Sequence, residues 1–292
     1  MAGEQTPLHR GATELLSRPL AVFGMALLAI MIAVALLAPL VASQNPYDPA
    51  QSSASDGLLP PGSTSSAGTT YWLGTDDSGR DMLSAILYGL RISLLVGVAS
   101  AAMALVIGIA TGFSAVYFHA MDSLIMWIAD IELSFPAILI LIIAMAFLGH
   151  GIVSLVVALF LMQWAYCARA IRRAVRTERT KAYVEAARCL ALPPWRIAFG
   201  HVLPNCLPSL VVVCAVQAST AIMLEATLSF LGLGLRFPTP SLGLLIADGY
   251  RHVLSGSYWI SLFPGMALVL LLVGINALVD QIRSITHADT MR

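Results

Sequence analysis

Charged side chains are scarce in this sequence: Asp, Glu, Lys and Arg make up 11% of the 292 residues, against roughly 25% in ordinary soluble domains. Hydrophobic residues make up 58%, and the mean hydropathy is +0.83. A soluble protein with so few charges could not keep its surface hydrated, so the composition predicts an integral membrane protein. The 16 basic and 16 acidic residues cancel. This balance argues against a nucleic-acid-binding protein, which would carry a basic excess.

Cysteine, histidine and lysine are also few. The four cysteines form no CxxC pair and the six histidines are scattered, so we expect no metal site. The only lysine, Lys181, precedes Ala182 and follows no glycine-rich loop. The chain therefore lacks the GxxxxGK[ST] loop that holds the phosphates of ATP. Ser, His and Asp occur without nucleophile–base spacing, so no catalytic residues or cofactors are expected in this chain.

Long apolar runs are what the sequence does contain. A helix needs about 20 apolar residues to cross a bilayer, and backbone in lipid must be helical. The fold expected is therefore an all-α integral membrane protein with six transmembrane helices. The third helix is expected to extend back toward Leu124, through Asp130 and Glu132. The six expected spans are Leu20–Ala42, Ile92–Phe118, Leu133–Gly149, Ile152–Ala168, Pro208–Leu231 and Trp259–Val279.

Basic residues predict the orientation of these spans. If both termini lie inside the cell, the inner segments hold 12 of the 16 basic residues and the outer segments hold 4. The positive-inside rule then places both termini in the cytoplasm. The first span is interpreted as a retained anchor, because its apolar run is longer than that of a secretory signal. The outer segment Ser43–Tyr71 is rich in Ser, Pro, Gly and Ala, which is typical of a flexible linker with little regular structure.

The inner segment Arg169–Asn205 is the most informative loop. Residues 178–190 are predicted to form a helix, since their charges form pairs at helical spacing. The expected pairs are Glu178 with Lys181, Lys181 with Glu185, and Glu185 with Arg188. Its smaller apolar side consists of Tyr183, Ala186, Ala187 and Leu190. Pro193 or Pro194 would then start a second short helix through Trp195 and Phe199. The residue pattern allows two interpretations of these short helices: an amphipathic segment on anionic lipid headgroups, or a docking element for a soluble partner.

A resemblance bears on that choice. Glu185-Ala186-Ala187, Leu190 and His201-Val202-Leu203-Pro204-Asn205 resemble the EAA loop of ATP-binding-cassette importer permeases. In that family the loop forms coupling helices that sit in a cleft of the ATPase subunit. The family usually has glycine at the position of Ala191, so the tight turn that follows the helix is in question here.

Other strings are similar to the peptide-permease branch of the same family, and together with the EAA loop they cover about residues 10–285. Three features of these strings depart from the family pattern: Ala85 replaces an arginine, Leu242 replaces a tryptophan, and the usual Leu-Asp-Pro tail is missing. The matching strings are Leu73-Gly74-Thr75-Asp76, Gly79-Arg80-Asp81, Ser84, Gly89–Leu94, Asp130 with Ser134-Phe135-Pro136, Glu225–Gly234, Pro238, Pro240-Ser241, and Asn276 and Asp280 with Arg283.

This resemblance implies the C-type permease subunit of a dipeptide or oligopeptide importer in the bacterial inner membrane, with a type I importer transmembrane domain. Its partners would be a second homologous permease, one or two ATPase subunits or a fused ATPase, and an extracytoplasmic peptide-binding protein. ATP and Mg²⁺ would bind to the ATPase partner. The expected organisation is an N-terminal tail, first helix and outer loop at 1–90, the transmembrane domain at 91–283, and a cytoplasmic tail at 284–292.

Individual residues carry different expectations. The resemblance places Glu185 against a basic group of the ATPase, with Tyr183, Ala186, Ala187, Leu190 and Ala191 completing the coupling set. Arg172, Arg173, Arg176 and Arg179 are interpreted as positive-inside determinants rather than partner contacts. Asp76, Asp77, Arg80 and Asp81 are expected to form a local charge network before the second span.

Two membrane carboxylates are candidate pathway or gate residues. An ionised carboxylate at mid-bilayer costs about 2.5–3.5 kcal/mol on insertion scales, so Glu225 should face protein or water. It either lines the path or makes a structural hydrogen bond to a neighbouring helix, and the sequence leaves both open. Asp130 and Glu132 are two residues apart and cannot share one helix face. Of these two we favour Asp130 as a pathway residue because of the family pattern.

Two alternatives to a peptide importer remain. Relatives in the same branch carry nickel or haem. An ion-driven secondary transporter is the alternative from another class, but such folds tend to show inverted repeats and helices broken at the midplane, and the sequence shows neither.

Overall fold

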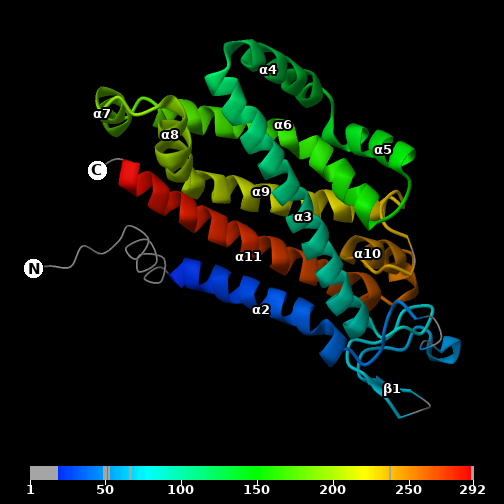
Figure 1. Ribbon diagram of the computed structural model, residues 1–292. Coiled ribbons are helices and arrows are strands. Elements are labelled where there is room, and N and C mark those ends of the chain that lie inside the picture. Colours follow the sequence, from blue (N-terminus) through cyan, green and yellow to red (C-terminus); the bar gives the residue numbers. More distant parts are fainter. Residues whose placement is uncertain (1–18, 49–50, 52, 66–67, 237, 291–292) are drawn as a thin grey trace, which may run out of the picture.

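The computed structural model describes residues 19–48, 51, 53–65, 68–236 and 238–290, with the side chains of 54 and 284–290 left out. Five helices are long and apolar enough to cross a membrane, and a bent helix pair brings the number to six if it counts as one span. Figure 1 shows α2, α11, α9 and α6 running side by side, with α3 crossing them obliquely. The five long helices are α2 Pro19–Val41, α3 Met82–Tyr117, α6 Ile152–Glu178, α9 Leu203–Phe230 and α11 Trp259–Thr290.

The expected third span is not one continuous helix. It consists of α4 His119–Leu133 and α5 Ala137–Leu148, which meet at an angle of 95°. The prediction that helix extends back from Leu133 through Asp130 to Leu124 is confirmed, because α4 covers these residues, but this helix is not continuous with the rest of the expected span. Pro136 explains the break, because proline has no N–H and disfavours helical geometry in the residue before it.

Helix ends also differ from the expected spans. α3 begins at Met82 and runs without a break through residues 90 and 91. The predicted boundary between the N-terminal segment 1–90 and the transmembrane domain 91–283 therefore falls inside this helix. Asp81 starts this helix by accepting hydrogen bonds from the backbone N–H groups of Leu83 and Ser84. α6 continues beyond Ala168 to Glu178. These extensions carry both helices past the apolar run that the sequence shows.

Small residues allow α3 to lie close against α6. A Cβ placed at Gly108 would meet the Cβ of Cys167 at 2.5 Å, and one at Gly112 would meet the backbone oxygen of Ala168 at 2.5 Å. Such close approach of backbones is how helices associate in membranes, where burial of apolar surface alone gives little driving force. The glycines therefore fix the contact that holds α3 against α6.

Short helices occupy the end of the bundle that we call the α7 end. α7 Ala182–Cys189 is followed by α8 Pro194–Ile197 and by the π-helical turn η3 Ala198–Val202. Pro194 is at the first position of α8, as expected. The first short helix starts four residues later than predicted, because Glu178 belongs to α6 and a turn separates the two helices.

The opposite end, which we call the α10 end, carries α10 Leu242–Tyr250, η4 Val253–Ser255, η2 Ala54–Asp56 and the hairpin of β1 Ser63–Thr64 and β2 Thr70–Tyr71. The segment Ser43–Tyr71 has little regular structure, as predicted, but its described part is attached to the rest of the fold and is not a free linker. Tyr71 Oη donates to Asp56 Oδ2 at 3.1 Å, and Thr75 Oγ1 donates to the backbone oxygen of Asp56 at 2.6 Å. Buried polar contacts of this kind order the segment despite its composition.

Candidate functional site

The residues of the predicted coupling loop lie together at the α7 end, and α7 is fastened to both neighbouring long helices. Lys181 Nζ lies 2.8 Å from Glu178 Oε2, which confirms the predicted pairing of these two residues. Tyr183 Oη donates to Glu178 Oε1 at 2.8 Å, and Asn205 Nδ2 donates to Tyr183 Oη at 3.3 Å. Because Glu178 ends α6 and Asn205 lies in α9, these contacts tie α7 to both helices.

The two faces of α7 differ from the expected division. Val184 and Ala187 are buried against the bundle, whereas Ala186 is exposed and Leu190 is 75% exposed. The predicted apolar side is therefore correct for Ala187 and the partly buried Tyr183 but wrong for Ala186 and Leu190. The spacing of three residues between Val184 and Ala187 sets the buried face. Ala186 and Leu190 lie with Glu185 on the face that has no partner within the described chain.

Glu185 is exposed on α7 and makes no ion pair within the described part of the chain. The helical pairs expected with Lys181 and Arg188 are thus not formed. Lys181 turns to Glu178 instead, where the carboxylate is mostly buried and the pairing is stronger. The Glu185 carboxylate is consequently available to a partner.

Ala191 keeps the turn after α7 without the glycine that the family usually has. Its φ is +55°, in the left-handed region that costs a residue with a Cβ about 1–2 kcal/mol. The backbone N–H of Leu192 donates to the oxygen of Ala187 at 3.2 Å, and that of Ala191 donates to the oxygen of Arg188 at 2.9 Å. The tight turn therefore forms, and the positive φ of Ala191 destabilises the folded protein by this amount.

The basic residues of α6 have specific partners in α4. Arg172 Nε and Nη2 donate to the two carboxylate oxygens of Asp122 at 2.5 and 2.6 Å, and Arg176 Nη2 donates to Asp122 Oδ2 at 2.7 Å. These contacts add a structural role to the charge-sorting role expected of the arginines. Sequence reasoning did not single out Asp122. Fifty residues separate it from Arg172, so only its position in the first turn of an amphipathic helix could have drawn attention to it.

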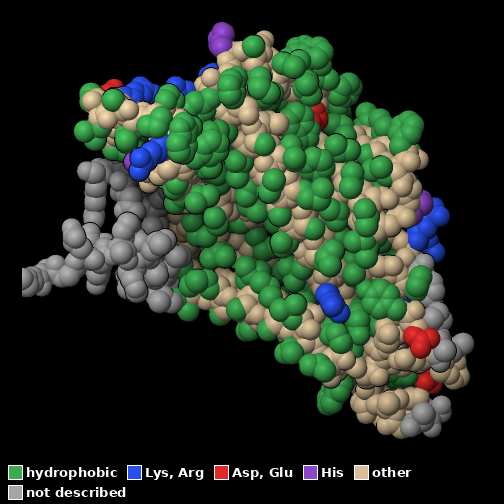
Figure 2. Space-filling model, viewed as in Figure 1, with side chains coloured by type: hydrophobic (Ala, Val, Ile, Leu, Met, Phe, Trp, Pro, Cys, Tyr) green, Lys and Arg blue, Asp and Glu red, His purple; other side chains and the backbone are tan. Residues whose placement is uncertain are grey.

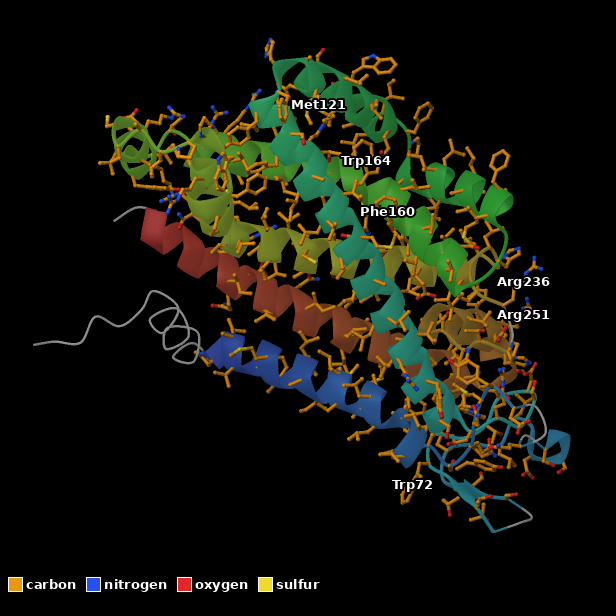
Figure 3. The ribbon with its side chains drawn as sticks, viewed as in Figure 1. Trp72, Met121, Phe160, Trp164, Arg236 and Arg251 are labelled. Carbon is orange, nitrogen blue, oxygen red and sulfur yellow. The ribbon has the colours of Figure 1, made fainter. Side chains whose placement is uncertain are left out.

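Asp130 lies farther along α4, where its side chain is largely exposed and paired with Arg169 of α6. Glu132 is half-buried and so lies on a different face of α4, as the two-residue spacing predicts. In Figure 3, Met121 marks α4 at the top of the view, and Trp164 and Phe160 mark α6 below it. The pathway role of Asp130 stays a prediction.

Glu225 lies inside the subunit rather than on its surface. The residue is 0% exposed. Ser93 Oγ of α3 donates to Glu225 Oε2 at 2.9 Å, and Ser229 Oγ donates to Glu225 Oε1 at 2.8 Å. This geometry is that of the hydrogen-bonding alternative, because the carboxylate joins α9 to α3. A pathway role would require these two helices to separate.

The predicted charge network before the second span is confirmed in its main contacts. Arg80 Nε donates to Asp76 Oδ2 at 2.5 Å, and Asp76 Oδ1 accepts from the backbone N–H of Arg80 at 2.9 Å. Asp81 also accepts from Ser43 Oγ at 2.8 Å, which joins the end of α2 to the start of α3. Trp72, Arg236 and Arg251 lie at this α10 end, far from α7 (Figure 3).

The surface of the molecule agrees with a membrane location. Figure 2 shows hydrophobic side chains over most of the visible middle of the molecule, whereas basic side chains gather around α7. Residues 104–287 match the family described as the binding-protein-dependent transport system inner membrane component. The chain belongs to this family. Residues 6–61 additionally match the N-terminal transmembrane domain of oligopeptide transport permease C. The protein is thus a multi-pass membrane permease.

Curated relatives resemble the chain over nearly its full length. A di/tripeptide transport system permease protein of Pseudomonas aeruginosa is 35% identical over 89% of this chain and 85% of its own length. A dipeptide transport system permease protein of Alkalihalophilus pseudofirmus is 34% identical over 95% of this chain and 88% of its own. Among solved structures, inward-facing conformations of the MetNI methionine ABC transporter contain a chain with a TM-score of 0.57 and 21% identity. That match covers 70% of this chain and 97% of the other, and it confirms the expected type I importer fold.

Proposed function

We propose that the chain is one of two permease subunits of an ATP-driven importer of short peptides. It would form half of the translocation path with a second homologous permease and receive its substrate from an extracytoplasmic peptide-binding protein. The relatives that support a peptide substrate are named as dipeptide and di/tripeptide permeases. In this proposal both termini and α7 are cytoplasmic, and ATP and Mg²⁺ bind to one or two ATPase subunits or a fused ATPase.

The observation that carries the proposal is the arrangement of α7. One face of the helix is buried and tied to α6 and α9, while the Glu185 carboxylate on the other face has no partner in the described chain. A partly desolvated pair between Glu185 and a basic group of an ATPase would join two rigid bodies. Closure of the ATPases on ATP would then move α7, and the helices attached to it would switch the path between its two open states.

The test is transport by the complete complex in liposomes. The chain is reconstituted with its second permease and ATPase, the peptide-binding protein is added, and ATP hydrolysis and dipeptide uptake are followed together. Glu185→Arg is expected to lower uptake by at least about tenfold, because it places like charges in a desolvated contact. Arg173→Glu is the matched control, since it reverses an exposed charge at the same end of the bundle.

Several results would contradict the proposal. Wild-type uptake and hydrolysis in a fully assembled Glu185→Arg complex would exclude the coupling role of this residue. Uptake driven by an ion gradient without ATP would exclude an ABC importer in favour of a secondary transporter. Uptake of nickel or haem without competition from dipeptides would exclude the peptide substrate.

A further inference from the structure

Two adjoining cavities lie at the α7 end, with volumes of about 420 and 380 Å³. These volumes are in the range of small-molecule sites, roughly 300–1,000 Å³. Arg179 and Arg188 line both cavities. The larger one is otherwise mostly apolar and is lined by Tyr117, Val184, Leu192, Pro194 and Ile197, while the smaller one is lined by Val116, Arg176 and Thr180.

Arg179 and Arg188, which line both cavities, carry positive charge that no ion pair within the described residues neutralises. Arg179 Nη1 donates to the backbone oxygen of Val116 at 2.9 Å, and its guanidinium lies 4.7 Å from the centre of the Tyr117 ring. These contacts fix the side chain but leave its charge uncompensated. Arg188 has no ion pair within the described residues. Arg176 binds Asp122, yet its side chain is 52% exposed.

The nearest acidic groups form no ion pair with Arg179 or Arg188. Glu178 faces α7 but pairs with Lys181 and accepts a hydrogen bond from Tyr183. Glu185 lies on the same helix as Arg188 and forms no pair with it. The two cavities therefore present a positive excess with guanidinium donors, and the Arg179 donor is held in place by its contacts. This is the chemistry that binds a phosphate group.

The length of α3 favours a position of these cavities near the lipid headgroups. The apolar part of α3 starts after Arg91, and the roughly 26 residues from Ile92 to Tyr117 span about 39 Å at 1.5 Å per residue. A bilayer's hydrocarbon core is about 30 Å thick. Even when α3 is tilted, its length therefore carries Tyr117 to the edge of this core or beyond it. Phe113, Tyr117 and Phe199 form a contacting aromatic group at this level, as is common at membrane interfaces.

We propose that these two cavities bind the phosphate headgroup of an anionic phospholipid from the membrane leaflet at the α7 end. The phosphate lies between Arg179 and Arg188, and the glycerol-ester end lies against the apolar wall formed by Val184, Leu192 and Ile197. Free phosphate shares the charged part of this chemistry. The apolar wall favours an amphiphile, because a free anion gains nothing from contact with it.

The test measures lipid binding directly and is independent of transport. The full chain, purified in detergent with its co-purifying subunits, is titrated with dioctanoylphosphatidylglycerol, and bound lipid is counted by native mass spectrometry. Dioctanoylphosphatidylcholine and inorganic phosphate are the competing probes. Arg188→Gln is expected to weaken phosphatidylglycerol binding about fivefold, and Arg179→Gln with Arg188→Gln about thirtyfold. Arg173→Gln is the control, since it removes an exposed arginine of α6 that lines neither cavity.

Each outcome decides the proposal. Selective loss in the Arg188→Gln chain with unchanged binding in the Arg173→Gln chain supports the site. Equal affinity for phosphatidylcholine, or equal loss in both single variants, overturns it in favour of unspecific attraction. Displacement of the lipid by inorganic phosphate at equal concentration shows a simple anion site. Absence of any bound lipid while a co-purifying ATPase is attached shows that the arginines contact protein instead.

Discussion

Substitutions of Asp122 and of its two arginine partners should lower the free energy of unfolding by different amounts. It accepts three hydrogen bonds from Arg172 and Arg176, two of them from Arg172, and its side chain is only 12% exposed. Removing one partner of a fully buried pair costs about 3–5 kcal/mol, and a charge-assisted hydrogen bond contributes about 1.5–3 kcal/mol. Because the arginines are partly exposed, we expect Asp122→Asn to lower the free energy of unfolding by about 2–3 kcal/mol.

The two arginines should differ. Arg172 is 26% exposed and contributes two of the three bonds, so Arg172→Gln should cost nearly as much as Asp122→Asn. Arg176 is 52% exposed and contributes one bond, so Arg176→Gln should cost about 0.5–1 kcal/mol. Arg173→Gln, on the exposed side of α6, should leave the free energy of unfolding within about 0.5 kcal/mol.

Denaturant unfolding of the purified chain in mixed micelles, followed by tryptophan fluorescence, measures these differences. The double variant of Asp122→Asn with Arg172→Gln should cost less than the sum of the single variants by about 1 kcal/mol or more, since the two residues share one contact. A larger loss for Arg176→Gln than for Arg172→Gln would refute the geometry. Strict additivity in the double variant would show that the α4–α6 contact does not depend on this pair.

Three further changes test the packing and the loop. Ala191→Gly should raise the free energy of unfolding by about 0.5–1 kcal/mol because it relieves a positive φ, and an unchanged midpoint would contradict this. Gly108→Ala should destabilise the chain by more than about 1 kcal/mol in the same assay, whereas Gly265→Ala, with open space around it, should not. Equal effects would contradict the close α3–α6 contact. Burial and the Glu178 hydrogen bond raise the pKa of Tyr183 to about 12. An unfolded phenol ionises near 10, so the stability that Tyr183 contributes relative to Tyr183→Phe should be full below pH 10 and fall as the pH rises toward 12. A difference that stays constant over this range would contradict the shift.

The membrane class and most spans follow from the sequence because long apolar runs have few other stable structures in lipid. The break at Ser134–Pro136 had a visible signal, since proline disfavours helix in the residue before it. Proline in the sequence does not by itself determine whether a helix kinks or breaks. The outcome depends on how α4 pairs with Arg172 and Arg169 of α6, and these contacts join residues far apart in the chain.

Local sequence patterns could not predict the structure of the segment between α2 and α3, for a similar reason. Its Ser, Pro and Gly content is typical of linkers. The contacts that order it join Tyr71 to Asp56, and Trp259 Nε1 to the backbone oxygen of Thr75 at 3.1 Å. The last contact crosses from α11, 184 residues away. Composition indicates the conformation of an isolated segment, whereas contacts with residues far away in the sequence determine its conformation in the folded protein.

Contacts of this kind around α7, the candidate coupling helix, would transmit its motion to the long helices in the proposed function. Tyr183, Glu178 and Asn205 attach α7 to α6 and α9, and Asp122 attaches α4 to α6. A displacement of α7 would therefore be transmitted to α6, α9 and α4. The 95° break between α4 and α5 is a place where α4 could turn relative to α5, because no helical hydrogen bonds continue across a proline break.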